Sequence, residues 1–204
     1  MTLEEATRQR IAEIIAAHPV TLFMKGRRGA PQCGFSATVI RILDALVPDY
    51  QTFDVLTDPE IRDGVKDYSS WPTIPQLYVR GEFVGGCDII QELFASEELH
   101  STLGVERPQV GEPKLEISAA AADALRRAEQ DALGGNALHL GIDARFRSAF
   151  YLAPRSEGEI SVESPGLELL MDPMSASRAD GVRVDVADGP GGTTFQIDNP
   201  NAPS

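Results

Sequence analysis

The chain has 204 residues, 42% of them hydrophobic, which is enough for one large domain or two ordinary domains with apolar cores. A formal net charge of −13 disfavours contact with phosphate backbones, so nucleic acid is not an expected partner. The two cysteines form no disulfide framework, and no apolar run approaches the ~20 residues of a membrane span. The acidic start Thr2-Leu-Glu-Glu5 is unlike a targeting sequence, so we expect a cytoplasmic protein that contacts no membrane.

Hydrophobic periodicity predicts alternating helices and strands in the first half of the chain. The expected elements are a helix at 3–17, a strand at 20–24, a helix at 34–47, a strand at 51–56, a short helix from 59, strands at 76–80 and 83–84 around a turn at 81–82, and a helix at 88–98. Pro19 should end the first helix, because the residue before a proline is disfavoured in helical conformation. Asp58 and Asp88 are each expected to cap the helix that follows. The order is βαβ followed by ββα, which predicts an α/β fold with helices on both faces of one sheet.

The most informative motif is Cys33-Gly-Phe-Ser36. Cys33 lies where a buried strand leads into a helix, and the dipole and free N–H groups of a helix N-terminus favour a thiolate. A dithiol redox site has a second cysteine three positions on, where this chain has Ser36. A thiolate without a resolving partner suits holding a soft metal or reacting with an external thiol such as glutathione.

Further blocks accompany this motif in the first half. They are Lys25, eight positions before Cys33, Trp71-Pro-Thr-Ile-Pro-Gln-Leu-Tyr78, and Gly81-Glu-Phe-Val-Gly-Gly-Cys-Asp88. With them, residues 4–104 resemble a monothiol glutaredoxin of the CGFS class, and the loop at 27–29 keeps the length of that class. The resemblance implies a thioredoxin-like fold. It also implies a homodimer bridged by a [2Fe–2S] cluster, whose ligands are the CGFS cysteine of each protomer and the thiolate of one bound glutathione per protomer.

The resemblance implies a glutathione pocket beside Cys33, which would be both the catalytic thiol and the metal ligand. Glutathione carries two carboxylates, so its pocket needs cations. Lys25, at the end of the first strand, can meet one carboxylate as a point charge, whereas a lone surface lysine would more often be solvated. Arg62, in the short helix, lies where the family places its contact to the glycine carboxylate.

The second side of the implied pocket comes from the later blocks. Ile74-Pro75 is the position of the family's cis-proline, which would let the backbone of Ile74 pair with a bound peptide, although ordinary turn chemistry stays open. Asp88, at a helix start, would bind the γ-glutamyl end through its N–H and carboxylate. Cys87 is expected to be a nearby, partly buried thiol that adds backbone contacts, and a disulfide with Cys33 is the alternative.

Residues 107–113, rich in proline and glycine, predict a linker between a domain at 1–106 and a second domain at 114–204. Ser118 should cap an alanine-rich helix at 119–131, which Gly134 and Gly135 would stop. Strands are then expected at 137–142, 149–152, 160–162, 167–171, 182–186 and 193–197. One helix followed by several strands predicts a small, β-rich α+β domain.

Four segments of this second domain resemble an A-type iron–sulfur carrier with the HesB-like fold. They are residues 117–123, 138–142, 171–175 and 195–201. In the carriers a cysteine follows the second of these segments, but here Arg147 stands at that place, and no C-G-C tail appears before Ser204. A guanidinium has no lone pair for a metal, so we expect a HesB-like domain without cluster ligands, which binds neither iron nor a cluster.

Three functions follow as hypotheses. The first is a protein that stores or transfers a glutathione-ligated [2Fe–2S] cluster, with a BolA-type protein or an iron–sulfur client as a candidate partner. The second is a glutathione-dependent thiol–disulfide oxidoreductase that removes glutathione from proteins through Cys33. The third is an interaction protein whose cysteine-free second half docks a client or an assembly factor.

Overall fold

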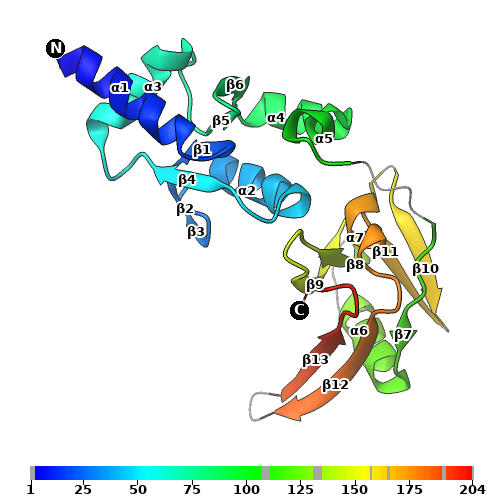
Figure 1. The fold of residues 1–204 in the computed structure, drawn as a ribbon. Coiled ribbons are helices and arrows are strands. Elements are labelled where there is room, and N and C mark those ends of the chain that lie inside the picture. The colour runs from blue at the N-terminus through cyan, green and yellow to red at the C-terminus, as the bar shows by residue number, and fades with distance from the viewer. Residues whose placement is uncertain are drawn as a thin grey trace. The chain divides into compact units, whose positions relative to one another are not determined.

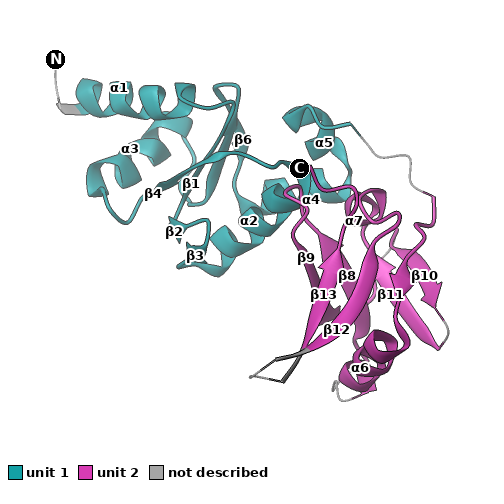
Figure 2. Cartoon of the chain, turned by 60° about the horizontal axis from the view of Figure 1, so that its bottom comes forward, with its two compact units in different colours: residues 1–106 teal, residues 107–204 magenta. Residues whose placement is uncertain are grey.

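A computed structural model describes residues 3–106, 111–130, 135–156, 158–164, 166–189 and 192–203. The chain divides into two compact units, residues 1–106 and residues 107–204 (Figure 2). Residues 107–110 of the expected linker lie outside the described residues. Within the described ranges, every helix is too short or too polar to cross a membrane.

Unit 1 contains the expected helices and strands in the expected order, together with two short strands within 26–31 and a helix at 98–103 that were not expected (Figure 1). Its elements are α1 (Leu3–Ala16), β1 (Val20–Met24), β2 (Gly26–Arg27), β3 (Ala30–Pro31), α2 (Gly34–Leu46), β4 (Gln51–Asp54), α3 (Pro59–Ser69), β5 (Gln76–Val79), β6 (Glu82–Gly85), α4 (Cys87–Ala95) and α5 (Glu98–Leu103). The longer strands form one sheet in the order β4-β1-β5-β6, in which β1 pairs parallel with β4 and antiparallel with β5. This topology is the expected thioredoxin-like fold.

The core of unit 1 forms because β1 is buried on both faces. On one face of the sheet, Phe23 packs with Ile11 of α1 and Ile61 of α3, and all three side chains are fully buried. Successive strand residues point to opposite faces, so Leu22 and Met24, also fully buried, point to the other face of the sheet. The helices pack pairwise, α1 against α3 and α2 against α4. Cys33, at the start of α2, is therefore positioned by a helix that packs within this core.

Several expected boundaries in unit 1 are wrong. The strand expected at 51–56 already ends at Asp54. Asp88 does not cap α4, because the extended backbone of Gly86 takes the capping position and Cys87 is already helical. That helix ends at Ala95 rather than at residue 98, since Glu97 adopts a left-handed conformation (φ 63°), and the unexpected α5 follows. The hairpin turn lies at residues 80–81 rather than 81–82, because both of those residues have positive φ, as a two-residue turn of type I′ requires.

Unit 2 is a small α+β unit. Its elements are β7 (Glu116–Ile117), α6 (Ala119–Gln130), β8 (Ala137–Ile142), β9 (Ser148–Ala153), β10 (Ile160–Ser164), β11 (Leu167–Met171), α7 (Pro173–Ser177), β12 (Arg183–Gly189) and β13 (Gly192–Asp198). The strands form two sheets, ordered β10-β11-β8-β9 and β13-β12-β7. Ser118 caps α6 as expected, since its hydroxyl accepts from the N–H of Ala121 (3.2 Å). The expected end of that helix at 131–134 lies outside the described residues.

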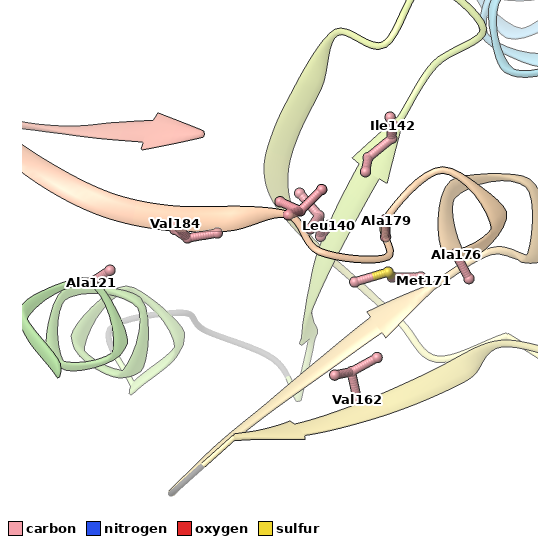
Figure 3. Packing of buried hydrophobic residues seen from close by; sticks show 9 residues of the cluster. Ala121, Leu140, Ile142, Val162, Met171, Ala176, Ala179 and Val184 are labelled. Carbon is pink, nitrogen blue, oxygen red and sulfur yellow. The ribbon is translucent and has the colours of Figure 1, made fainter. Parts of the chain in front are cut away.

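The core of unit 2 lies where α6 and β12 meet the four-stranded sheet. Figure 3 shows Leu140 and Ile142 of β8, Met171 of β11 and Val184 of β12 in one cluster, with Ala121 on the facing side of α6. All five side chains are at most 1% exposed. Unit 2 therefore has a hydrophobic core of its own, as a separate domain requires.

Candidate functional site

Cys33 is the N-cap residue of α2, with extended backbone angles (φ −153°, ψ 135°). Its thiol is not in a disulfide and is partly exposed. The backbone N–H of Ser36, which lies near the thiol without closing a cap hydrogen bond, is the main cause that lowers the pKa of Cys33, against a smaller opposing effect of burial. The N–H of Phe35 and the charge of Lys25 lower the pKa further. The start of α2 thus favours the thiolate, as the sequence predicts.

Ser36, which replaces a second thiol, has both a structural and an electrostatic role. It is fully buried, and its hydroxyl accepts from the backbone N–H of Lys25 (3.2 Å), which ties the first turn of α2 to the end of β1. The Ser36 side chain is also the smallest of the causes that lower the pKa of Cys33. Ser36 therefore helps to hold the thiolate as well as the helix start.

The two cations predicted for the pocket differ in their placement. Lys25 is half-buried, its carbonyl accepts from Gln32 N–H (2.9 Å), and its charge acts on Cys33. Arg62 is exposed in the first half of α3. Neither Lys25 nor Arg62 forms an ion pair with any residue that the structure describes, so both charges are available to an anion. Of the two cations, only Lys25 has a charge effect on Cys33 among the causes that lower its pKa.

The segment before β5 meets the start of α4. The Ile74–Pro75 peptide bond is cis, as the resemblance implies, and the side chain of Ile74 is buried in the core of unit 1. A Cβ atom at Gly86 would lie 2.7 Å from Nε1 of Trp71 and 3.5 Å from the carbonyl oxygen of Pro75. Gly86 therefore has to be glycine for the two segments to approach this closely.

Cys87 is buried at the first position of α4, and its thiol contacts Oε1 of Gln91 (3.3 Å). Burial is the main cause that raises the pKa of Cys87, and the charges of Asp88 and of the Cys33 thiolate raise it further. The structure thus brings the two cysteines within electrostatic reach of each other and favours thiolate at one and thiol at the other. The side chain of Asp88 is exposed, and its negative charge acts on the site by raising the pKa of Cys87.

Asp54 is a residue of the site that the sequence analysis did not identify. Its carboxylate Oδ1 accepts from the backbone N–H groups of Gly26 (2.9 Å) and Leu56 (3.0 Å). It thereby fixes the base of the loop that leads from Lys25 to Cys33. An aspartate near the end of a strand was the available signal, because its short carboxylate accepts from nearby backbone N–H groups.

In unit 2, Arg147 is exposed and paired with Asp143, with Nε 2.7 Å from Oδ2. The described parts of the chain contain no group of three or more histidine, cysteine, aspartate or glutamate side chains that could hold a metal ion. Residues 107–204 contain no cysteine at all.

Comparison with known proteins identifies the family to which unit 1 is similar. The glutaredoxin family model matches residues 20–84. A monothiol glutaredoxin of Synechocystis sp., ycf64-like, is 54% identical over 99 residues, which are 48% of this chain and 92% of that protein. The chain belongs to the monothiol glutaredoxin family. The chloroplastic monothiol glutaredoxin S7 of rice is 51% identical over 47% of this chain, but this match spans only 57% of the rice protein.

Among solved structures, reduced poplar apo GrxS14 is similar, with a TM-score of 0.46 and 45% identity. That match covers 51% of this glutaredoxin chain and 95% of the poplar chain.

Proposed function

We propose that this monothiol glutaredoxin binds a [2Fe–2S] cluster together with glutathione, and stores or transfers it. The observation that carries the proposal is that one cysteine per chain is accessible and has a lowered pKa. Cys33 is partly exposed with a lowered pKa, while Cys87, the only other cysteine, is buried with a raised pKa. A [2Fe–2S] cluster typically takes four thiolate ligands, so one protomer cannot hold it. Two Cys33 thiolates and two glutathione thiolates would complete the set in a homodimer.

The residues around Cys33 fit glutathione as the second source of thiolate. Lys25 and Arg62 carry positive charges without ion-pair partners in the described chain, and would bind its two carboxylates. The backbone of Ile74, before the cis bond, would pair with its peptide groups. Asp88 and Cys87, in the first turn of α4, would receive the γ-glutamyl end through backbone N–H groups.

For unit 2 we propose a HesB-like domain that has lost its cluster ligands. Support comes from the absence of cysteine in residues 107–204 and from the Arg147–Asp143 pair at the place of a carrier ligand. Unit 2 would then serve as a dimerisation surface, or as a docking surface for a BolA-type protein or an iron–sulfur client. We place this function in the cytoplasm.

Anaerobic reconstitution with iron, sulfide and glutathione tests the proposal. We expect a coloured dimer with one cluster per two chains, and a colourless protein without the cluster. Cys33→Ser should abolish the visible absorbance, while the matched variant Cys87→Ser should keep most of it. Equal loss in both variants would mean that both protein thiols are ligands. Iron that remains in full-length Cys33→Ser protein would contradict the proposal for unit 2.

The lowered pKa of Cys33 also supports a second function, as a glutathione-dependent oxidoreductase. The Cys33 thiolate would attack the glutathione sulfur of a glutathionylated protein, form a mixed disulfide with glutathione and release the protein thiolate. A second glutathione thiolate would then release glutathione disulfide and restore the Cys33 thiolate. The test is turnover of a glutathionylated peptide, which we expect in the parent protein and not in Cys33→Ser. A rate no higher than that of the uncatalysed exchange would rule out this second function and leave cluster binding.

A further inference from the structure

We propose that Gln76 is a positioning residue for glutathione, because its side-chain amide fixes the backbone that carries the N–H of Ile74. This inference rests on the proposed function, in which the backbone of Ile74 pairs with the peptide groups of bound glutathione. Gln76 lies at the start of β5 and is fully buried, so it makes none of the proposed contacts to glutathione itself. It acts through the loop at 70–75, which joins α3 to β5.

The amide of Gln76 holds this loop by two hydrogen bonds to backbone carbonyl groups. Nε2 of Gln76 donates to the carbonyl oxygen of Trp71 (2.9 Å) and to that of Thr73 (3.1 Å). A carbonyl oxygen accepts hydrogen bonds and cannot donate them, so these two contacts decide which end of the amide is the nitrogen. Both N–H bonds of the amide are thereby used to hold the loop.

The oxygen of the same amide faces two hydroxyl groups. Oε1 accepts from the hydroxyl of Tyr78 (3.1 Å) and can accept from that of Ser69 (3.0 Å), which also reaches the carbonyl oxygen of Val65 (3.0 Å). Burial is the main cause that raises the pKa of Tyr78 to about 12, so its hydroxyl keeps the proton that it donates. A buried amide with a partner at every position loses hydrogen bonds when it turns, so this network holds Gln76 in one orientation.

The loop has few backbone hydrogen bonds of its own. Two of its residues are prolines, which have no N–H. In the part of the chain that the structure describes, none of the turn and loop hydrogen bonds between backbone groups involves residues 72–75. At the α3 end, the N–H of Trp71 donates to the carbonyl oxygen of Lys66 (3.0 Å). Gln76 therefore ties the carbonyl groups of the loop to the sheet.

The hydrogen bond to Thr73 sets the direction of the Ile74 N–H. The peptide bond between Thr73 and Ile74 is trans, and in a planar trans peptide the C=O and the N–H point in opposite directions. The carbonyl of Thr73 points at the buried amide of Gln76, so the N–H of Ile74 points away from it. Among the described residues this N–H has no hydrogen-bond partner, so it is available to a ligand.

Replacement of Gln76 by methionine removes both donors and keeps an unbranched side chain of similar length. The carbonyl oxygens of Trp71 and Thr73 would then lack their buried donor and would turn toward water. Because a peptide unit turns as a plane, the N–H of Ile74 would leave the direction in which glutathione needs it. Glutathione should therefore bind more weakly, although the cations of the pocket are unchanged.

Trp71 is the only tryptophan in the chain, so its fluorescence reports on the loop without any ligand. In full-length protein without cluster or glutathione, acrylamide should quench Trp71 about twofold more strongly in Gln76→Met than in the parent, because the loop opens locally. Calorimetry on the same proteins should show that the dissociation constant for glutathione rises about fivefold, as for the loss of one hydrogen bond.

Ile15→Ala is the matched control. Ile15 is a buried residue of α1 in the core of unit 1, and its truncation leaves the Gln76 amide and the four partners of that amide in place. This variant should lower the melting temperature of unit 1 through the lost burial, and should change neither the quenching of Trp71 nor the dissociation constant for glutathione.

Unchanged quenching or an unchanged dissociation constant in folded Gln76→Met protein would overturn the inference, and so would equal effects in Ile15→Ala. If Gln76→Met does not fold, Tyr78→Phe keeps the ring and removes one donor to Oε1. It should raise the dissociation constant about twofold, and no change would refute the role of the network. A parent protein that binds no glutathione would refute the proposed function, and with it the role of Gln76 toward glutathione. Stronger quenching in Gln76→Met would then still show that the amide fixes the loop.

Discussion

Replacement of Ser36 by alanine should separate the stability of the site from the reactivity of its thiol. The Ser36 hydroxyl is fully buried and accepts from the backbone N–H of Lys25 (3.2 Å). Without it this N–H loses its partner, and an unsatisfied buried donor costs ~1–3 kcal/mol. Because Lys25 is half-exposed, water can replace part of the bond, so we expect the free energy of unfolding of unit 1 to fall by about 1 kcal/mol.

The thiol should respond much less. The main cause of the lowered pKa of Cys33 is the backbone N–H of Ser36, which alanine keeps, and the hydroxyl is the smallest cause. The alkylation rate of Cys33 at pH 6 should therefore fall less than about twofold. Because the folded-state pKa lies below the ordinary value of 9.0, the thiolate stabilises the folded state at pH 9 and above, and this contribution is lost as pH falls through the folded-state pKa. The variant should keep that pH dependence.

Urea unfolding followed by the fluorescence of Trp71, the only tryptophan in the chain and a residue of unit 1, measures the first effect. Ser96→Ala is the control, because Ser96 is exposed and its hydroxyl donates only to the carbonyl of Leu93 (3.3 Å). A fivefold loss of Cys33 reactivity without loss of stability would refute the reasoning, since it would make the hydroxyl rather than the backbone the main support of the thiolate.

Three further predictions concern other parts of the chain. Lys25→Gln and Arg62→Gln should each weaken glutathione binding by ~1–3 kcal/mol, measured by calorimetry on folded protein, and unchanged affinity in the double variant would place the pocket elsewhere. Asp58→Ala should destabilise unit 1 by about 1 kcal/mol at pH 7, because the carboxylate caps α3 through Ile61 N–H (3.1 Å). That bond is the main cause that lowers the pKa of Asp58, so the difference from the parent protein should vanish as pH falls through the lowered pKa. Leu140→Ala should destabilise unit 2 by ~2–5 kcal/mol in circular dichroism melts and leave the alkylation of Cys33 unchanged.

The regular elements with mostly apolar runs could be predicted from sequence, because burial on both faces leaves a clear pattern. The strands at 20–24, 137–142 and 167–171 have the predicted bounds for this reason. The helix α7 was not predicted, although Asp172 caps it and Pro173 opens it, the same local pattern that predicted α3. A contact far apart in sequence also holds it. Ser175 in α7 donates to Ile142 O and accepts from Ile142 N–H (2.9 Å), 33 residues away, and no local pattern encodes that pairing.

The two cysteines show where prediction of the site from sequence reaches its limit. Both lie at the start of a helix, Cys33 as the N-cap of α2 and Cys87 as the first residue of α4, and a helix N-terminus favours a thiolate in both cases. Their pKa values nevertheless move in opposite directions. Cys33 is partly exposed and lies near the backbone N–H groups of Ser36 and Phe35 and the charge of Lys25. Cys87 is buried beside the carboxylate of Asp88, and there burial and charge repulsion outweigh the helix dipole. A motif can therefore identify the position of a cysteine on a helix, but the solvent exposure and neighbouring charges that decide its reactivity come from the folded chain.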